Sequence, residues 1–156
     1  MIFQDWSKVN QWNESVHNLG FLLRQASTLW RRKLEMVLLP LNITYMQFIL
    51  LGNLSWHEHF KKNPSQIELA KFCKIDANMT SQALQNLEKK GYLERIHKPH
   101  NEKIKIPKLT QLGKSVIKQA VPLVRREDRK FFSSLSMELK PFEEFLQKLI
   151  KHNISY

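Results

Sequence analysis

The first part of the chain carries a long amphipathic pattern that predicts a helix. Residues 12–39 contain no proline, and apolar side chains recur there at alternating intervals of four and three residues, at Trp12, Val16, Leu19, Leu23, Ala26 and Trp30. This spacing places them along one stripe of an α-helix, as in a helix that packs against another helix. Pro40 ends the pattern, because the residue before a proline disfavours the helical conformation.

Three further helices are predicted by their start signals. Residues 44–47 (TYMQ) and 65–68 (SQIE) are capping-box sequences, in which the first and fourth side chains satisfy backbone amides at a helix start. The first predicts a helix through FILLGNLSW, followed by a polar loop, HEHFKKN. The second predicts a short helix that ends near Cys73. Asp76 is a suitable N-cap for a third helix, which Gly91 ends.

The rest of the chain predicts a hairpin and two helices. YLERIHKPHNEKIKIPKL has the pattern of two short strands around a polar turn, with Ile104 and Ile106 alternating with lysines. Thr110 caps a helix through GKSVIKQAVPLVRREDRKFF, in which Pro122 predicts a kink. A last amphipathic helix carries Leu139, Phe142, Phe145, Leu146 and Leu149. The expected fold class is therefore mainly α with one small β-hairpin.

The helix that follows Asp76 has two different faces. At 100° per residue, Met79, Ala83, Leu84 and Leu87 gather on one side and are expected to pack on the preceding helices. Thr80 falls on that side, so we interpret it as a partly buried structural hydroxyl. The opposite face carries Asn78, Ser81, Gln82, Gln85 and Lys89, with Asn86 at its margin. Such groups can hydrogen-bond base edges in a DNA major groove, although a solvated polar face is the simpler alternative.

The predicted hairpin favours the nucleic-acid interpretation. It carries the basic residues Arg95, Lys98, Lys103, Lys105 and Lys108, with Glu94 and Glu102 as its only acids. A short helix, a turn, a second helix and a basic hairpin form the order of a winged helix-turn-helix. In that arrangement the hairpin can lie over phosphates or a minor groove while the helix occupies the adjacent major groove. His97 and His100 could add pH-dependent charge, but an exposed turn explains them more simply.

The charge of the whole chain points the same way. Lys and Arg total 25 against 14 acidic residues, a formal net charge of +11, which suggests a polyanionic partner such as nucleic acid or a membrane surface. The longest apolar run, MQFILLGNLSW, is about half of the roughly 20 residues that a membrane span needs. The N-terminus lacks the pattern of a secretory signal. A single cysteine excludes an internal disulfide framework, so we expect a cytoplasmic protein.

The order and spacing of several short motifs resemble the MarR family of bacterial transcriptional regulators over roughly residues 15 to 150. The matching residues are Ile43-Thr44-x-x-Gln47, Ser65-Gln66-x-Glu68-Leu69-Ala70, Thr80, Leu87-Glu88-Lys89-Lys90-Gly91-Tyr92-Leu93-Glu94-Arg95 and Leu109-Thr110-x-x-Gly113. The resemblance implies a homodimer whose first and last helices interlock. It implies binding to pseudo-palindromic operators and release by small, often aromatic ligands or by cysteine oxidation. An apolar bundle seam with Trp12, Trp30, Phe131, Phe132, Phe142 and Phe145 fits such a dimer.

The tip of the hairpin departs from the family pattern. The family usually carries Asp-x-Arg there, with the arginine entering the minor groove and the aspartate holding it in place. The matching positions in this chain are Asn101 and Lys103. Lysine lacks the planar fork of arginine and carries a more strongly hydrated charge, so it is a poorer minor-groove probe. We therefore expect the hairpin to bind phosphate and the helix to carry more of the sequence readout.

Three further signals concern ligands. Cys73 could be a redox switch, but an inward thiol without basic neighbours behaves as a small hydrophobe. His57-Glu58-His59 suggests a metal, but three consecutive residues cannot all converge on one ion from a regular element, and a surface loop is the simpler interpretation. The family resemblance places an effector pocket between the dimer helices and the winged helix, with Arg24, Trp30 and Tyr45 as expected lining residues; core packing explains the aromatics equally well.

Together these observations predict a sequence-specific double-stranded DNA-binding regulator that acts as a homodimer, with a repressor as the expected type and a small aromatic or anionic effector. Residues 43–110 are expected to form the winged helix-turn-helix, and residues 1–42 and 111–156 the helical dimerisation region. Asn78, Ser81, Gln82, Gln85 and Asn86 would face bases, and Lys89, Arg95, Lys98, Lys103 and Lys105 would contact phosphates or the groove edge. No cofactor, metal or catalytic activity is expected. The rival hypothesis is a winged-helix module that binds protein or metal without specific DNA binding.

Overall fold

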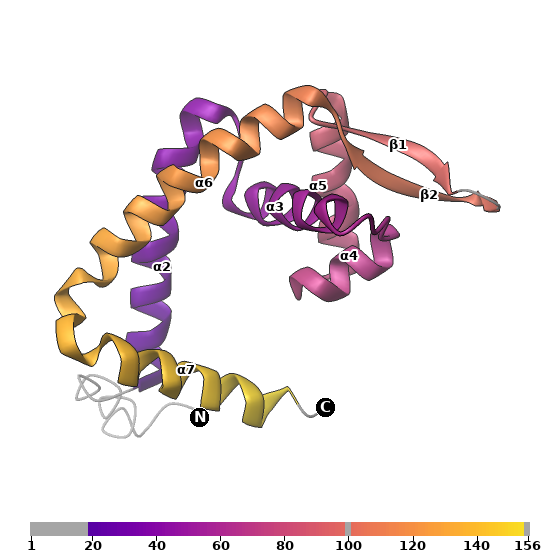
Figure 1. Cartoon of the computed structure of the whole chain (residues 1–156). Coiled ribbons are helices and arrows are strands. Elements are labelled where there is room, and N and C mark those ends of the chain that lie inside the picture. The colour runs from indigo at the N-terminus through magenta and orange to yellow at the C-terminus, as the bar shows by residue number, and fades with distance from the viewer. Residues whose placement is uncertain (1–18, 99–100, 155–156) are drawn as a thin grey trace, which may run out of the picture.

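A computed structural model describes residues 19–98 and 101–154, apart from the side chains of residues 102 and 103 (Figure 1). The predicted Trp12 and Val16 of the first helix lie outside the described residues, as does His100. The elements in chain order are α2 Leu19–Leu38, η2 Leu39–Leu41, α3 Tyr45–His59, α4 Gln66–Cys73, α5 Ala77–Lys89, β1 Leu93–Lys98, β2 Asn101–Leu109, α6 Gln111–Phe132, η3 Ser133–Glu138 and α7 Leu139–Asn153. The fold is mainly α with one hairpin, as predicted.

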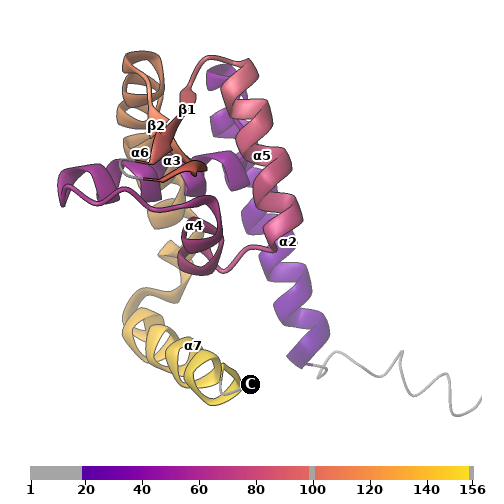
Figure 2. The same ribbon diagram turned by 90° about the vertical axis from the view of Figure 1, so that its right-hand side faces the viewer.

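The elements form a lobe and a helical arm. The arm consists of α2 and α6 running side by side, with α7 lying across their far end (Figures 1 and 2). Within the arm the indole Nε1 of Trp30 donates a hydrogen bond to Asp128 Oδ1 at 2.7 Å. The lobe contains α3, α4 and α5, and the β1–β2 hairpin projects from it away from the arm. The hairpin and α7 therefore lie far apart, at the upper right and at the bottom of Figure 1.

The hydrophobic core lies in the lobe and continues into the near end of the arm. Its fully buried centre is formed by leucines of α2, α3, α4, α5 and β1, namely Leu34, Leu38, Leu50, Leu51, Leu54, Leu69, Leu84, Leu87 and Leu93. Val116, Ile117, Ala120 and Val124 of α6 belong to the same cluster. Because one core joins α2 and α6 to the lobe, packing in that core sets how α5 lies relative to the arm in this structure.

The predicted helix starts are confirmed. Thr44 and Ser65 both form complete capping boxes, and Asp76 accepts hydrogen bonds from the amides of Asn78 and Met79. Thr110 caps α6 through the amide of Gly113. Gly91 follows α5 at φ +74°, in the left-handed region that glycine adopts without strain.

Two predictions about burial are wrong. The stretch after FILLGNLSW does not begin as a polar loop, because α3 continues through His59; His57 is buried, with only 1% of its surface exposed. The ring of Phe72 on α4 packs 4.6 Å from the His57 ring and covers it. Met79 does not pack into the core and is 49% exposed. The buried stripe of α5 runs through Thr80, Ala83, Leu84 and Leu87, and Met79 lies 100° before Thr80, at its edge.

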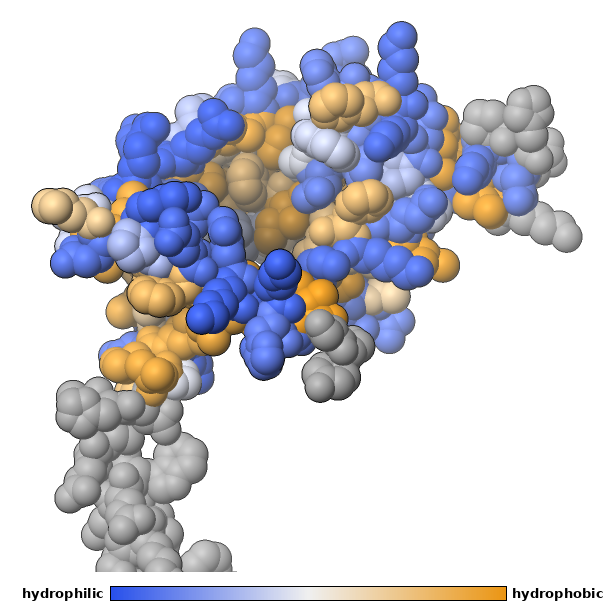
Figure 3. All heavy atoms as spheres, turned by 60° about the horizontal axis from the view of Figure 1, so that its bottom comes forward, coloured by the Kyte–Doolittle hydropathy of each residue, from blue (hydrophilic) through white to orange (hydrophobic). Residues whose placement is uncertain are grey.

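Large apolar side chains remain exposed on the arm. On α2 they are Leu19, Phe21, Leu22, Leu23, Leu29 and Met36, and on α7 they are Leu139, Phe145, Leu149 and Ile150. The face seen from below in Figure 1 has a hollow with hydrophobic atoms in it and hydrophilic atoms around it (Figure 3). α7 has no buried residue, so residues 19–98 and 101–154 leave the apolar face of this helix uncovered.

No single helix among residues 19–98 and 101–154 is long and apolar enough to cross a membrane. Leu19–Leu41 and Tyr45–His59 form a bent pair that meets at 71°, and by length and composition alone this pair is long and apolar enough to cross a membrane. In this fold α3 contributes Leu50, Leu51 and Leu54 to the protein core.

Candidate nucleic-acid interface

A helix-turn-helix is formed by α4, a short turn and α5. Lys74 ends α4 in the left-handed conformation at φ 55°, and Asp76 begins α5 two residues later. The buried Leu69 of α4 and Leu84 of α5 belong to the same core cluster. Thr80 is fully buried, and its hydroxyl donates to the carbonyl of Asp76 at 2.9 Å. The structural interpretation of Thr80 is therefore confirmed.

The polar face of α5 is presented to solvent. Of the side chains expected to face DNA bases or phosphates there, Ser81 is half-buried. The others are exposed, namely Asn78, Gln82, Gln85, Asn86 and Lys89. The opposite side of the helix is held in the core by Ala83, Leu84 and Leu87. The structure thus brings these polar groups together on one ordered helix surface, where they can donate and accept hydrogen bonds.

The hairpin is an antiparallel ladder whose root is buried. Leu93 pairs with Leu109 and Ile96 with Ile106, and an irregularity falls between His97 and Lys98. Toward the tip, Lys105 is exposed and Lys98 is half-buried. Lys103 belongs to β2, but the structure does not describe its side chain. The basic residues of the hairpin therefore follow the apolar root toward the free end.

Arg95 is tied to the end of α5, which the sequence did not indicate. Its Nε lies 3.3 Å from Glu88 Oε2, and only 22% of the Arg95 side chain is exposed. An ion pair of this kind partly compensates the charge of the guanidinium. Arg95 therefore joins β1 to the end of α5. The spacing of seven residues between Glu88 and Arg95 gives no local signal of this pair, because a turn and a strand start intervene.

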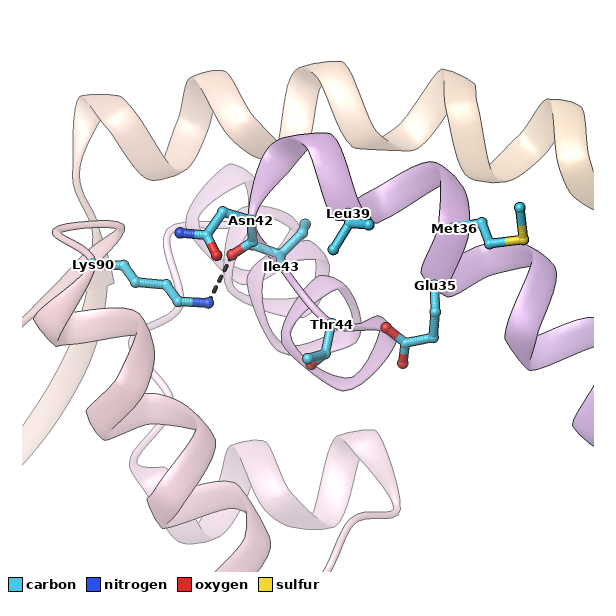
Figure 4. Close-up of a pocket in the computed structure, with 7 residues that line it drawn as sticks. All are labelled: Glu35, Met36, Leu39, Asn42, Ile43, Thr44 and Lys90. Atoms are coloured by element: carbon cyan, nitrogen blue, oxygen red, sulfur yellow. Dashed lines mark hydrogen bonds between the residues drawn. The ribbon is translucent and has the colours of Figure 1, made fainter.

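Lys90 is a second residue that the sequence did not single out. Its Nζ donates to the carbonyl of Asn42 at 2.7 Å and to Gln47 Oε1 at 3.1 Å. Burial lowers the pKa of Lys90. The residue lines a pocket of about 290 Å³ with Glu35, Met36, Leu39, Asn42, Ile43 and Thr44 (Figure 4). This pocket lies where the arm, the start of α3 and the end of α5 meet.

The residues expected to line an effector pocket are only partly brought together. The rings of Trp30 and Tyr45 meet edge to face at 5.1 Å, and burial, with Asp128 nearby, raises the pKa of Tyr45. Arg24 is exposed, with its guanidinium 5.5 Å from the ring centre of Phe21. Trp30 also lines an apolar groove of about 310 Å³ with Leu23, Ala26, Ser27, Phe131, Phe132, Phe142 and Leu146.

The thiol and the histidines have surroundings that limit their chemistry. Burial raises the pKa of Cys73 to about 11, so the reactive thiolate is disfavoured at neutral pH. His57 points into the protein while His59 is exposed, and they do not converge. Across the described part of the chain, no group of three His, Cys, Asp or Glu side chains could hold a metal ion.

A helix-turn-helix followed by a basic antiparallel hairpin defines a winged helix, a fold of DNA-binding proteins. The sequence model described as the MarR family matches residues 41–104. The chain is 34% identical over 133 residues to the uncharacterized HTH-type transcriptional regulator YdcH of Bacillus subtilis, covering 85% of this chain and 90% of that protein. The chain therefore belongs to the MarR family, and it is a transcriptional regulator of that family.

Solved structures of other family members share the fold. A MarR mutant from E. coli, crystallised in complex with operator DNA, aligns with a TM-score of 0.76 at 27% identity, over 88% of this chain and 96% of that chain. The Mycobacterium tuberculosis MarR family protein Rv2887, in complex with DNA, aligns with a TM-score of 0.62 at 26% identity, over 84% of this chain and 96% of that chain. These alignments extend beyond the winged helix into the helical arm.

Proposed function

We propose that this regulator binds double-stranded DNA in a sequence-specific manner as a homodimer and represses transcription from a pseudo-palindromic operator. The observation that carries the proposal is the exposed polar face of α5 beside the basic hairpin. Two family members of similar fold have been crystallised with DNA, which supports it. The net charge of +11 favours association with the phosphate backbone.

The two elements have different roles in the proposed complex. α5 would lie in the major groove, with Asn78, Ser81, Gln82, Gln85 and Asn86 facing base edges. Lys89, Arg95, Lys98, Lys103 and Lys105 would contact phosphates or the groove edge. The Glu88–Arg95 ion pair suggests that Arg95 sets the angle between β1 and α5 more than it contacts a phosphate.

The proposed dimer uses the uncovered faces of the arm. The exposed apolar side chains of α2 and α7 form more apolar surface than scattered single residues would. A second copy with the same faces would cover them, and two copies related by a two-fold axis would present two α5 helices to two half-sites. In this proposal residues 1–42 and 111–156 form the dimerisation region and residues 43–110 the DNA-binding region.

The proposal includes release by a small aromatic or anionic effector. The pocket around Lys90 supports this part, because it is bounded by α2 on one side and by the end of α5 on the other. Within it Lys90 offers an ammonium group and Leu39 and Ile43 offer apolar surface. A ligand bound there can change the angle between the arm and α5 only if it binds more tightly to the protein at one such angle than at another.

Competition binding to DNA tests the proposed readout. Gel-shift titrations would compare the region upstream of the protein's own gene with random duplex, at physiological salt. The wild type should prefer the upstream DNA, and Gln82→Ala combined with Gln85→Ala should reduce that preference, because each lost bidentate contact to a base costs about 1–3 kcal/mol of discrimination.

Gln119→Ala is the matched control, because Gln119 is an exposed glutamine on α6. It should leave the preference unchanged. Equal affinity of the wild type for both duplexes would contradict specific binding. A variant that loses affinity equally for all duplexes would contradict the base-facing assignment of Gln82 and Gln85.

A further inference from the structure

A pocket beside the tip end of β1 is separate from both the polar face of α5 and the pocket around Lys90. It lies between the end of α3, the loop that follows it, α4 and β1, and its volume is about 340 Å³. The lining residues are His57, Lys62, Asn63, Pro64, Glu68, Phe72 and Lys98. They come from segments that are distant in sequence, so only the folded lobe assembles the pocket.

His57 forms the inner wall and lacks the partners that a buried imidazole needs. It is 1% exposed, yet neither ring nitrogen has a hydrogen-bond partner among residues 19–98 and 101–154. The rings of Phe72 and Trp56 pack edge-on at 4.6 and 5.0 Å and hold it in place. A buried polar group without a partner is unfavourable, so this ring is suited to a ligand that supplies one.

Most of the other polar groups around the pocket are hydrogen-bond donors. Lys62 and Lys98 contribute ammonium groups and Asn63 an amide. The one carboxylate, Glu68, is engaged in the capping box, where its Oε2 accepts from the Ser65 amide at 2.7 Å. Those hydrogen bonds lower the pKa of Glu68, and Lys98 and His57 contribute further. The pocket therefore combines excess positive charge with an unpaired inner donor.

We propose that this pocket binds a small oxyanion, a carboxylate or phosphate group, with the His57 imidazole as its inner donor and Lys62 and Lys98 on either side. Phe72 and Pro64 provide an apolar wall for the rest of such a ligand. Without an anion, burial and Lys62 lower the pKa of His57, against a smaller opposite effect of Glu68. A bound anion would favour the imidazolium and raise that pKa.

The oxyanion can come from two sources. It can be a free small anion, or it can be a backbone phosphate of bound DNA; the second source rests on the proposed function, in which Lys98 contacts phosphate. Because Lys98 would serve both, a free anion in the pocket would compete with that phosphate contact. The pocket would bind a free anion without DNA, whereas it would hold a backbone phosphate only when DNA is bound.

The test is a histidine-observed NMR titration of the full chain with inorganic phosphate, at constant ionic strength and without DNA. We expect a saturable shift of the His57 ring resonances and a rise of the His57 pKa, while His59, exposed on the same helix, reports non-specific effects. A second titration uses a duplex oligonucleotide in place of phosphate. If phosphate alone shifts His57, the occupant is a free anion; if only duplex does, it is a backbone phosphate.

Adjacent lysines provide the matched variants. Lys62 lines the pocket and Lys61 does not, so Lys62→Met should weaken binding about tenfold, equivalent to about 1.4 kcal/mol, while Lys61→Met changes it less than about twofold. Equal weakening by both variants would mean general attraction to a basic surface and would overturn the site. Absence of a saturable His57 shift with either probe would also overturn it. Phosphate binding without specific DNA binding would contradict the proposed function and leave this site standing.

Discussion

Gly113 lies where the first turn of α6 meets the backbone at the root of the hairpin. A Cβ atom at this position would lie 1.9 Å from the carbonyl oxygen of Tyr92. Thr110 fixes the same corner, because its hydroxyl donates to the carbonyl of Gly91 at 2.6 Å and accepts from the Gly113 amide at 3.1 Å. Glycine is therefore required at position 113 because two backbone segments approach closely there, and not because of its φ angle.

Gly113→Ala should lower the free energy of unfolding by about 3 kcal/mol, because the added methyl group must displace backbone. Gly52→Ala is the control: the nearest atom to its added Cβ would be Ile117 Cδ1 at an ordinary 3.7 Å. Because Gly52 is inside α3, alanine there should stabilise the protein by up to about 1 kcal/mol. Urea denaturation of both variants measures the difference, and a Gly113→Ala variant as stable as wild type would contradict the close approach.

The buried His57 should make stability depend on pH. Its pKa is lowered from the ordinary value of 6.5, mainly by burial, so the unfolded chain binds the proton more readily than the folded chain. The free energy of unfolding should therefore fall as the pH drops from 6.5 to the lowered pKa, and the loss is complete below it. Above pH 6.5 this contribution is constant.

His57→Phe should remove that part of the pH dependence, because a phenyl ring fills similar space beside Phe72 and takes up no proton. The measurement is urea denaturation between pH 7.5 and about 5 in a buffer of low anion content. His59→Phe changes an exposed imidazole of the same helix and is the matched control. If the slope of stability against pH is the same in His57→Phe as in wild type, the burial of an unpaired imidazole is disproved.

α5 and the hairpin are rigidly related through their shared core and the Glu88–Arg95 pair. Their sequence explains why each forms, since Asp76 begins α5, Gly91 ends it and alternating Ile104 and Ile106 indicate a strand. The orientation of α5 and the hairpin relative to each other depends on tertiary contacts. In the proposed complex with DNA, this orientation would determine how far along the duplex the hairpin lysines lie from the polar face of α5.

Lys105→Met should reduce the slope of log affinity against log salt by about one unit, equally for operator and random duplex, because one phosphate contact is lost. Lys118→Met removes the same charge from an exposed position on α6 and should leave the slope unchanged. Binding constants measured over a salt series distinguish the two. Equal changes in both variants would show that net charge, and not a hairpin contact, governs the affinity.

The arm has an apolar face that the described part of the chain leaves uncovered. Phe145 is 65% exposed, and α7 as a whole buries no side chain. The groove between α2, α6 and α7 is lined almost entirely by apolar groups. Such a surface is typical of a helix that packs on another copy.

Phe145→Glu should shift the protein from dimer to monomer, because it would place a charge in the centre of the proposed apolar interface. Lys151→Glu introduces the same residue on the polar side of α7 and should leave the dimer intact. Sedimentation velocity over a concentration series measures the association state. A wild-type chain that is monomeric at all concentrations would contradict the proposed dimer, and operator affinity should fall together with dimerisation.

Local signals explain which parts of the fold could be predicted. Capping boxes at Thr44 and Ser65, the N-cap Asp76 and the left-handed Gly91 act within one turn of chain, so the sequence contains the whole interaction. The end of α3 was predicted wrongly because HEHFKKN is polar by composition. α3 continues through His59, and the ring of His57 is buried against Phe72 of α4, a contact that has no local signature.

The same distinction applies to the candidate sites. The periodicity of α5 was enough to place Gln82 and Gln85 on a solvent face and Ala83, Leu84 and Leu87 in the core. It did not reveal that Arg95 pairs with Glu88, that Lys90 reaches Asn42, or that Lys62 and Lys98 share a pocket with His57. Those contacts join residues 7 to 48 positions apart or lie on separate elements.

The sequence by itself determined the order of elements, the helix starts, the family and the two faces of α5, because each follows from interactions between near neighbours or from a motif of fixed spacing. Only the tertiary structure decided which polar groups are paired between distant elements and which are buried without a partner. The reason is physical: burial and charge compensation depend on segments that the chain brings together from a distance. For this protein those segments are the end of α3, α4 and the hairpin.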